Sequence, residues 1–145
     1  MINTNSTLYS KSSLLINSPL SHVWSVQTNI KQWPKWQKNI TNVQALDNVS
    51  KGSTFKWKAS GLAITSKVEE FKEERVIGWS GKSIGMTANH WWYFESEGNS
   101  TRVTTEESLN GWLAQIFKIV MPGFLDKSLK DALEKLKVES ERIHK

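Results

Sequence analysis

The stretch that decides the fold is "HWWYFESEGNSTRVTTEESLNG", residues 90–111. It contains two runs rich in β-forming residues, separated by the turn residues Gly98 and Asn99, and this pattern predicts an antiparallel β-hairpin. Side chains alternate between the two faces of a strand, so the first run, extended upstream, divides into two sets. One face is apolar except for a histidine and carries Met86, Ala88, His90, Trp92 and Phe94. The other face carries Trp91 and Tyr93.

The second run of the hairpin places one carboxylate on an otherwise uncharged face, which carries Val103, Thr105, Glu107 and Leu109. If this face and that of His90 point the same way, neighbouring strands could bring His90 and Glu107 together, in a register that the sequence does not fix. His90 then has three possible roles. It is a histidine whose ring nitrogens hydrogen-bond to a neighbouring residue or water, a polar anchor for a ligand, or a general acid or base. Glu107 either faces solvent or has a partner, because burying a bare carboxylate is costly.

The rest of the region from residue 41 to residue 109 also has the pattern of strands. In "STFKWKAS", residues 53–60, Phe55 and Trp57 alternate with polar residues, which indicates a strand with one packed and one solvated face. Turn residues recur about every ten positions, and this spacing predicts an antiparallel meander.

The chain ends in a pattern typical of a long amphipathic helix. Apolar or small residues recur at steps of three and four: Leu125, Leu129, Ala132, Leu133, Leu136, Ser140 and Ile143. One face of this helix must therefore pack against another element. The preceding "GWLAQIFKIVMPG", residues 111–123, is apolar nearly all round, and Pro122-Gly123 predicts a break between the two segments. A curved sheet that grips one long helix is the simplest way to cover its apolar face.

Length and composition narrow the class of protein. The 145 residues suit a single domain, residues 1–145, and eight tryptophans predict an aromatic core or a cavity lined with rings. The absence of cysteine excludes disulfides and thiolate metal sites. The sequence has no nucleotide-binding loop and no metal-ligand spacing among its histidines, so we expect neither a cofactor nor a metal.

The net charge of +5 is unevenly distributed, with seven lysines and one acidic residue in residues 1–60. These lysines are scattered, which favours a solvated surface over binding to nucleic acid; an anionic partner is the alternative. The sequence contains no signal peptide and no run of apolar residues long enough to span a membrane. We therefore expect a cytoplasmic protein without a membrane span.

Two segments resemble the polyketide cyclase/dehydrase-like families of the START and birch-pollen-allergen superfamily, also called SRPBCC. In "SPLSHVWSVQTNIKQWPKWQKNI", residues 18–40, the places of the family pattern are filled by Asn29, Trp33, Pro34 and Trp36. The hairpin at residues 90–111 resembles the family's late hairpin, with its His-x-Trp-x-Phe strand, glycine turn and Thr-Arg-Val-Thr strand. The resemblance covers nearly the whole chain.

This resemblance implies an α+β helix-grip fold. In that fold a seven-stranded curved antiparallel sheet wraps around a long C-terminal helix, two short helices follow the first strand, and a deep apolar cavity lies between sheet and helix. Members cyclise polyketides, carry lipids and sterols, sense hormones or bind quinones. They share no single catalytic motif, so no catalytic residue is transferred to this chain.

Our first hypothesis is that the protein binds a hydrophobic or amphipathic small molecule, such as a lipid or polyketide-like compound, for carriage or sensing. The predicted ligand-binding residues are Phe55, Trp57, Ile64, Trp79, Met86, His90, Trp92, Thr105, Glu107, Trp112, Ile116 and Phe117. The alternative is a cyclase or dehydratase that uses His90 and Glu107 for proton transfer. A third hypothesis is an interaction module for a membrane or a large assembly that uses the basic N-terminal part of the chain. Trp91 and Tyr93 either pack under loops or form an exposed patch that would serve as a partner surface.

Overall fold

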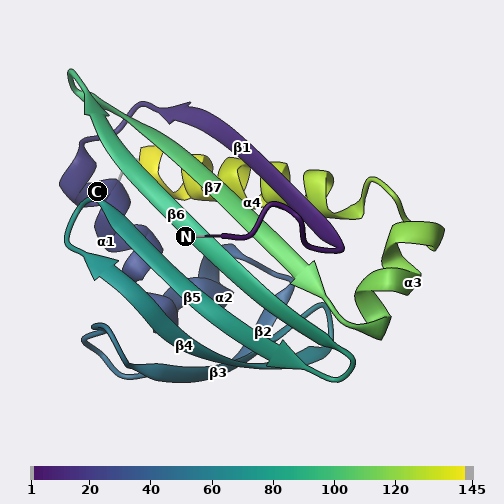
Figure 1. The fold of residues 1–145 in the computed structure, drawn as a ribbon. Coiled ribbons are helices and arrows are strands. Elements are labelled where there is room, and N and C mark those ends of the chain that lie inside the picture. The colour runs from purple at the N-terminus through teal and green to yellow at the C-terminus, as the bar shows by residue number, and fades with distance from the viewer. Residues whose placement is uncertain (1, 143–145) are drawn as a thin grey trace.

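The structure is a computed structural model that describes residues 2–142. Seven strands form one antiparallel sheet in the order β1-β7-β6-β5-β4-β3-β2, and the long helix α4 lies across one face of it (Figure 1). The strands are β1 (Leu8–Ile16), β2 (Ile40–Gln44), β3 (Thr54–Ala59), β4 (Leu62–Lys72), β5 (Val76–Ser83), β6 (Met86–Glu97) and β7 (Ser100–Asn110). The helices are α1 (Leu20–Thr28), the 3-10 turn η1 (Ile30–Gln32), α2 (Trp33–Trp36), α3 (Trp112–Val120) and α4 (Phe124–Glu141). The predicted helix-grip architecture is thereby confirmed.

The β6–β7 hairpin has the register that brings the two candidate polar residues together. His90 lies directly opposite Glu107, and Trp92 lies opposite Thr105. Both strands turn their apolar face toward α4, where Val103 is fully buried. The alternation of side chains suggested that His90 and Glu107 could pair but did not determine the register. The fold has the register that pairs them.

Helix α4 buries one stripe of leucines against the inner face of the sheet. Leu125, Leu129, Leu133 and Leu136 are at most 4% exposed, and the burial of each such side chain contributes about 1.5–3 kcal/mol. The predicted break after α3 is present, because the chain leaves helical geometry between Val120 and Phe124. Ile143, which the sequence pattern placed on the same stripe, lies outside the described residues.

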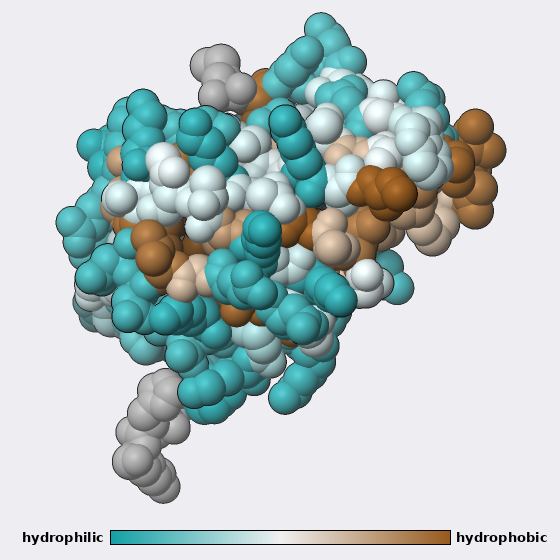
Figure 2. Space-filling model, turned by 90° about the horizontal axis from the view of Figure 1, so that it is seen from below, coloured by the Kyte–Doolittle hydropathy of each residue, from teal (hydrophilic) through white to brown (hydrophobic). Residues whose placement is uncertain are grey.

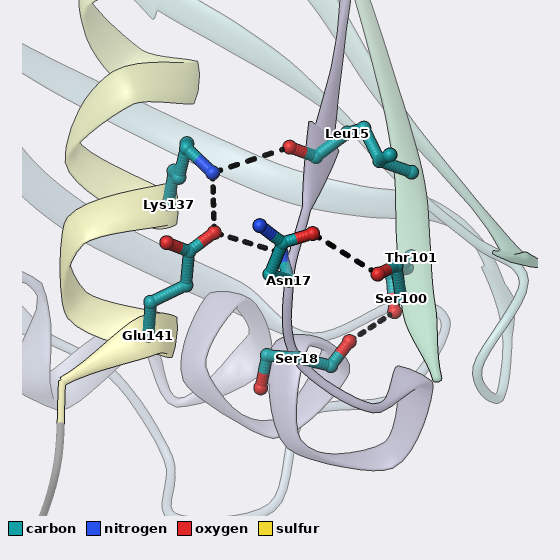
Figure 3. A network of polar contacts seen from close by, with 7 residues as sticks. All are labelled: Leu15, Asn17, Ser18, Ser100, Thr101, Lys137 and Glu141. Carbon is teal, nitrogen blue, oxygen red and sulfur yellow. Dashed lines mark hydrogen bonds and ion pairs between the residues drawn. The ribbon is translucent and has the colours of Figure 1, made fainter. Parts of the chain in front are cut away.

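Polar contacts tie the last turns of α4 to the edge of the sheet (Figure 3). The Glu141 carboxylate accepts a hydrogen bond from the backbone N–H of Asn17 at 2.7 Å and pairs with the Lys137 ammonium group. Asn17 Oδ1 in turn accepts a hydrogen bond from Ser100 Oγ at 3.1 Å, at the start of β7. These contacts hold α4 to the end of β1 and thereby fix the helix across the sheet.

The short helices after β1 close one end of the sheet with aromatic packing. The Trp24 ring of α1 meets Phe94 edge to face, with ring centroids 5.1 Å apart. Trp33, at the start of α2, contacts Trp57 and Trp79 at centroid distances of 5.3 and 5.4 Å. Its indole N–H donates to the backbone carbonyl of Gln27 at 2.9 Å. The one polar atom of this large buried ring therefore has a hydrogen-bond partner.

The outer face of the sheet does not offer the partner surface that the sequence suggested at Trp91 and Tyr93. Trp91 is only 6% exposed, because its ring lies over Gly78 on the neighbouring strand. Its indole N–H donates to the Glu70 carboxylate at 2.7 Å, and this bond holds the pKa of that carboxyl below its usual range. The Tyr93 hydroxyl donates to Glu106, so both side chains have partners within the chain.

The segment before β1 also crosses this outer face. Figure 1 shows it running back over the sheet toward β6, and Ile2 is buried there, with 7% of its surface exposed. Near the start of β1, the Tyr9 hydroxyl donates to the other oxygen of the Glu106 carboxylate at 2.7 Å. Burial and this carboxylate together raise the pKa of Tyr9 to about 12.

Candidate ligand-binding cavity

A cavity of about 580 Å³ lies between the inner face of the sheet, α3 and α4. The curvature of the sheet creates it, because α4 contacts β1 and the end near α1 but stands away from the middle strands. The structure places most of the predicted ligand-binding residues on its wall: Trp57, Ile64, Trp79, Met86, His90, Trp92, Glu107 and Phe117. These residues come from β3 to β7 and from α3, so segments distant in sequence form one surface.

Four of the predicted residues lie away from the cavity wall. Phe55 is buried in the aromatic core, with 3% exposed, and Thr105 is fully buried beside the His90 ring. Trp112 and Ile116 point outward from α3 and are 60% and 45% exposed. The sequence identified α3 as a wall element but did not indicate which face of it turns inward.

Several wall residues were missed by the sequence analysis. Leu113 joins Phe117 on the inner face of α3, and Met121, which follows the helix, also lines the cavity. The i, i+4 spacing of Leu113 and Phe117 could have signalled this face, but α3 is apolar nearly all round. The remaining missed residues come from α1 to β2, the β3–β4 turn and its flanks, β7 and α4: Gln27, Trp33, Gln37, Asn39, Ile40, Ala59, Ser60, Gly61, Leu62, Leu109, Phe124, Leu125, Ser128, Leu129 and Ala132.

His90 is held by hydrogen bonds that determine which ring nitrogen carries the proton. The Thr105 hydroxyl donates to the backbone carbonyl of Trp91 at 3.0 Å. It must then accept from His90 Nε2, which lies 2.8 Å from Thr105 Oγ1. The proton of the neutral imidazole is therefore on Nε2, and Nδ1 is left as an acceptor, 3.5 Å from Glu107 Oε2.

The surroundings of this pair favour its uncharged state. Trp79 and Trp92 flank the imidazole, with ring centroids 5.1 and 5.3 Å away. Burial lowers the pKa of His90 to about 3 and raises the pKa of Glu107 to about 8, because a low-dielectric site penalises both imidazolium and carboxylate. The side chains nevertheless remain 12% and 18% exposed, since both reach the cavity. A protonated Glu107 can donate a hydrogen bond, and His90 Nδ1 can accept one.

The electrostatics of the wall restrict what the cavity can hold. Among residues 2–142, no lysine or arginine lines the cavity, and Glu107 is the only acidic residue of its wall. An anionic group bound beside Glu107 would therefore have no cationic partner. Within residues 2–142, Gln27 Oε1 and Trp92 Nε1 also have no hydrogen-bond partner, but both atoms are fully buried and are not exposed to the cavity. The wall is thus suited to uncharged groups that both donate and accept hydrogen bonds.

A smaller polar hollow of about 210 Å³ adjoins the cavity. It shares Gln37, Asn39, Ser60 and Ser128 with the main wall and adds the charged residues Asp131 and Lys135 of α4. The Lys135 ammonium group donates to Asn39 Oδ1 at 2.8 Å. The combined space therefore has an apolar interior and a polar side region.

Residues 2–142 show neither a metal-binding cluster nor a membrane-spanning helix. That part of the chain contains no group of three or more His, Cys, Asp or Glu side chains able to hold a metal ion. It also contains no helix with the length and apolar character needed to cross a membrane.

Comparison with known proteins agrees with this architecture. The family described as "Polyketide cyclase / dehydrase and lipid transport" matches residues 10–141. A search of curated proteins found no match. A hypothetical protein of Helicobacter pylori has a similar structure, with a TM-score of 0.86 at 19% identity, covering 97% of this chain and 92% of its own.

Two other solved structures share the fold at lower identity. The Zhui aromatase/cyclase of a Streptomyces species has a TM-score of 0.79 at 12% identity, with 93% of this chain and 94% of that chain covered. A START superfamily protein of Mycobacterium smegmatis has a TM-score of 0.72 at 11% identity, with 92% and 97% covered. The family match spans most of the sequence and the fold agrees, so this chain belongs to the family described as polyketide cyclase/dehydrase and lipid transport.

Proposed function

We propose that residues 1–145 act as one domain that binds a hydrophobic or amphipathic small molecule, for carriage or sensing, in the cavity between the sheet and α4. The observation that supports this most is the largely apolar, partly open cavity of about 580 Å³ with the facing His90 and Glu107 on its wall. Apolar walls supply affinity, and a few placed polar groups orient the ligand. The family description, which includes lipid transport, points to the same class of molecule.

The polar groups narrow the class of ligand. Glu107 in its protonated form donates, and His90 Nδ1 accepts, so a hydroxyl or carbonyl group pairs with this site while a carboxylate does not. A lipid or polyketide-like compound with such an uncharged oxygen in its apolar part fits the wall. Its more polar end would lie toward the hollow at Asn39 and Lys135. The cytoplasmic location expected from the sequence stays a prediction.

The direct test is mass spectrometry of small molecules extracted from the purified protein, followed by fluorescence titration with the extracted compound or an apolar dye. Trp57, Trp79 and Trp92 lie on the wall, so binding should quench tryptophan emission saturably. Trp92→Ala should weaken binding at least several-fold, whereas Trp112→Ala, which alters a ring outside the wall, should leave the affinity unchanged. Quenching that never saturates, or equal effects of the two substitutions, would count against the cavity as the site.

A second candidate function is catalysis of a cyclase or dehydratase type, and the facing His90 and Glu107 favour it. In a dehydration, Glu107 would give its proton to a departing hydroxyl as water leaves, and His90 Nδ1 would take a proton from the adjacent carbon. The proton on the imidazolium would then return to the carboxylate across the 3.5 Å gap. The aromatase/cyclase among the similar structures makes this chemistry worth testing.

His90→Gln separates the two candidate functions, because glutamine can donate and accept a hydrogen bond but cannot shuttle a proton. A binder should keep its affinity within a few fold and show no turnover in either form. An enzyme should lose about 10²–10⁴-fold in rate at nearly unchanged affinity. We expect the first outcome.

A further inference from the structure

Helix α3 carries a group of large apolar side chains that no other part of residues 2–142 covers. Ile119 is 80% exposed and Val120 is 69% exposed. We call the whole group the α3 patch, defined as Ile84, Trp112, Ile116, Ile119, Val120 and Met121, and each member is at least 42% exposed. Figure 2 shows hydrophobic residues gathered at this end of the molecule, on the right. Surfaces of this kind commonly mark an interaction site.

The patch is continuous across two segments of the chain. The Trp112 ring lies against Gly85, since a Cβ added to that glycine would stand 2.4 Å from the indole. The backbone N–H of Leu113 also donates to the Gly85 carbonyl at 2.9 Å. Ile84, which is 75% exposed, precedes this glycine in the β5–β6 turn. The turn and α3 therefore present their apolar side chains together.

The opposite face of α3 is a wall of the cavity. Leu113 and Phe117 line it, and Phe117 packs on Phe124 across the Pro122-Gly123 break, with ring centroids 5.0 Å apart. Met121 follows the last residue of α3 and borders both the cavity and the patch. One short helix thus separates the ligand space from the exposed patch. Whatever covers the patch lies within one helix diameter of the cavity.

The charges around the patch indicate the kind of partner. Residues 111–130 contain three lysines and one aspartate, and Lys118, Lys127 and Lys130 are all exposed. The aspartate, Asp126, already accepts a hydrogen bond from Ser10. A second copy docked through the same surface by two-fold symmetry would bring Lys118 toward its own counterpart. An anionic bilayer offers both an apolar interior and negative head groups.

We propose that the α3 patch docks on an anionic lipid surface, with Ile119 and Val120 among the acyl chains and the lysines near the head groups. Trp112 lies at the edge of the patch, a place where aromatic rings favour the membrane–water interface. Docking in this orientation places α3 between the bilayer and the cavity, because the other face of this helix lines the cavity. The inference concerns a surface outside the cavity and stands whether or not the cavity binds a ligand.

The test is flotation of the purified protein with vesicles of phosphatidylcholine alone or mixed with phosphatidylglycerol. We expect the wild type to float with the mixed vesicles, weakly with the neutral ones, and progressively less as salt is raised. Ile119→Asp should reduce binding to mixed vesicles at least ten-fold. The matched control is Val138→Asp, which alters an exposed residue near the other end of α4 (67% exposed) and should bind as the wild type does.

A second measurement tests whether Trp112 lies at the lipid surface. Brominated lipids in the mixed vesicles should quench part of the tryptophan emission, and Trp112→Phe should remove that part. Absence of wild-type binding to mixed vesicles, or equal losses in Ile119→Asp and Val138→Asp, would overturn the proposal. So would a wild-type dimer in light scattering that Ile119→Asp converts to a monomer, because the patch would then serve self-association.

Discussion

Glu107→Gln tests the electrostatic description of the cavity through the pH dependence of stability. The folded protein holds this carboxyl protonated, with its pKa raised from 4.5 to about 8 by burial. A raised pKa means that the folded state binds the proton more tightly than the unfolded state. Its contribution to stability is therefore complete below about pH 4.5 and is lost as the pH rises through about 8. Each pH unit in this window is worth about 1.4 kcal/mol.

The wild type should consequently lose about 4 kcal/mol relative to Glu107→Gln between pH 5 and pH 8. Contact with cavity solvent reduces this figure, so we expect a measured difference of about 2–4 kcal/mol. The assay is urea unfolding of both proteins at half-unit pH intervals, in which the pH dependence of the other groups cancels. A difference curve that stays flat, or one in which the wild type gains stability with rising pH, would refute the assignment. A flat curve would indicate a carboxyl whose pKa does not change on folding, and a gain with rising pH would indicate a carboxylate that the folded protein stabilises in its ionised form.

Two further substitutions test the packing around the site. Thr105→Val removes the oxygen that accepts from His90 Nε2 and should lower the unfolding free energy by about 1–3 kcal/mol. Thr105→Ser should retain most of that stability in the same urea titration, and equal losses would contradict the hydrogen bond. Gly78→Ala places a Cβ 2.2 Å from the Trp91 ring and should cost about 1–3 kcal/mol. Gly123→Ala, whose added Cβ meets nothing within 4 Å, is the control, and similar losses in both alanine variants would contradict the steric explanation.

Alternation and turn spacing were enough to predict an antiparallel sheet and the inward face of the hairpin. The steps of three and four and Pro122-Gly123 predicted the broken helix, and the family resemblance implied the seven-stranded helix-grip. The pairing of His90 with Glu107 was only conditional, because alternation assigns faces but not register. Register depends on the hairpin turn at Gly98, which has a positive φ of 64°, and on packing across the whole sheet. Thr105 was expected to touch a ligand, but it lies beside the imidazole and orients it.

The residues that the sequence misplaced share a physical cause. Trp112 and Leu113 are neighbours in an apolar helix, so periodicity alone could not show which of them turns inward. Trp91 faces the side of the sheet that alternation assigns to solvent, yet Gly78 on the next strand provides space beneath its ring. The polar wall residues Gln37 and Asn39 come from the connection between α2 and β2, where no periodic pattern exists to place them.

The sheet order has a consequence for the timing of synthesis. β1 has no neighbour but β7, and Leu8 pairs with Leu109, so the first strand emerges from the ribosome long before its partner. At typical rates of translation, about 5–20 residues per second, the delay is roughly 5–20 s. Helix α4, which packs against β1 and β7, is made later still. During that interval the nascent chain carries an incomplete sheet with exposed aromatic rings, and this is the period in which chaperones would have most to protect.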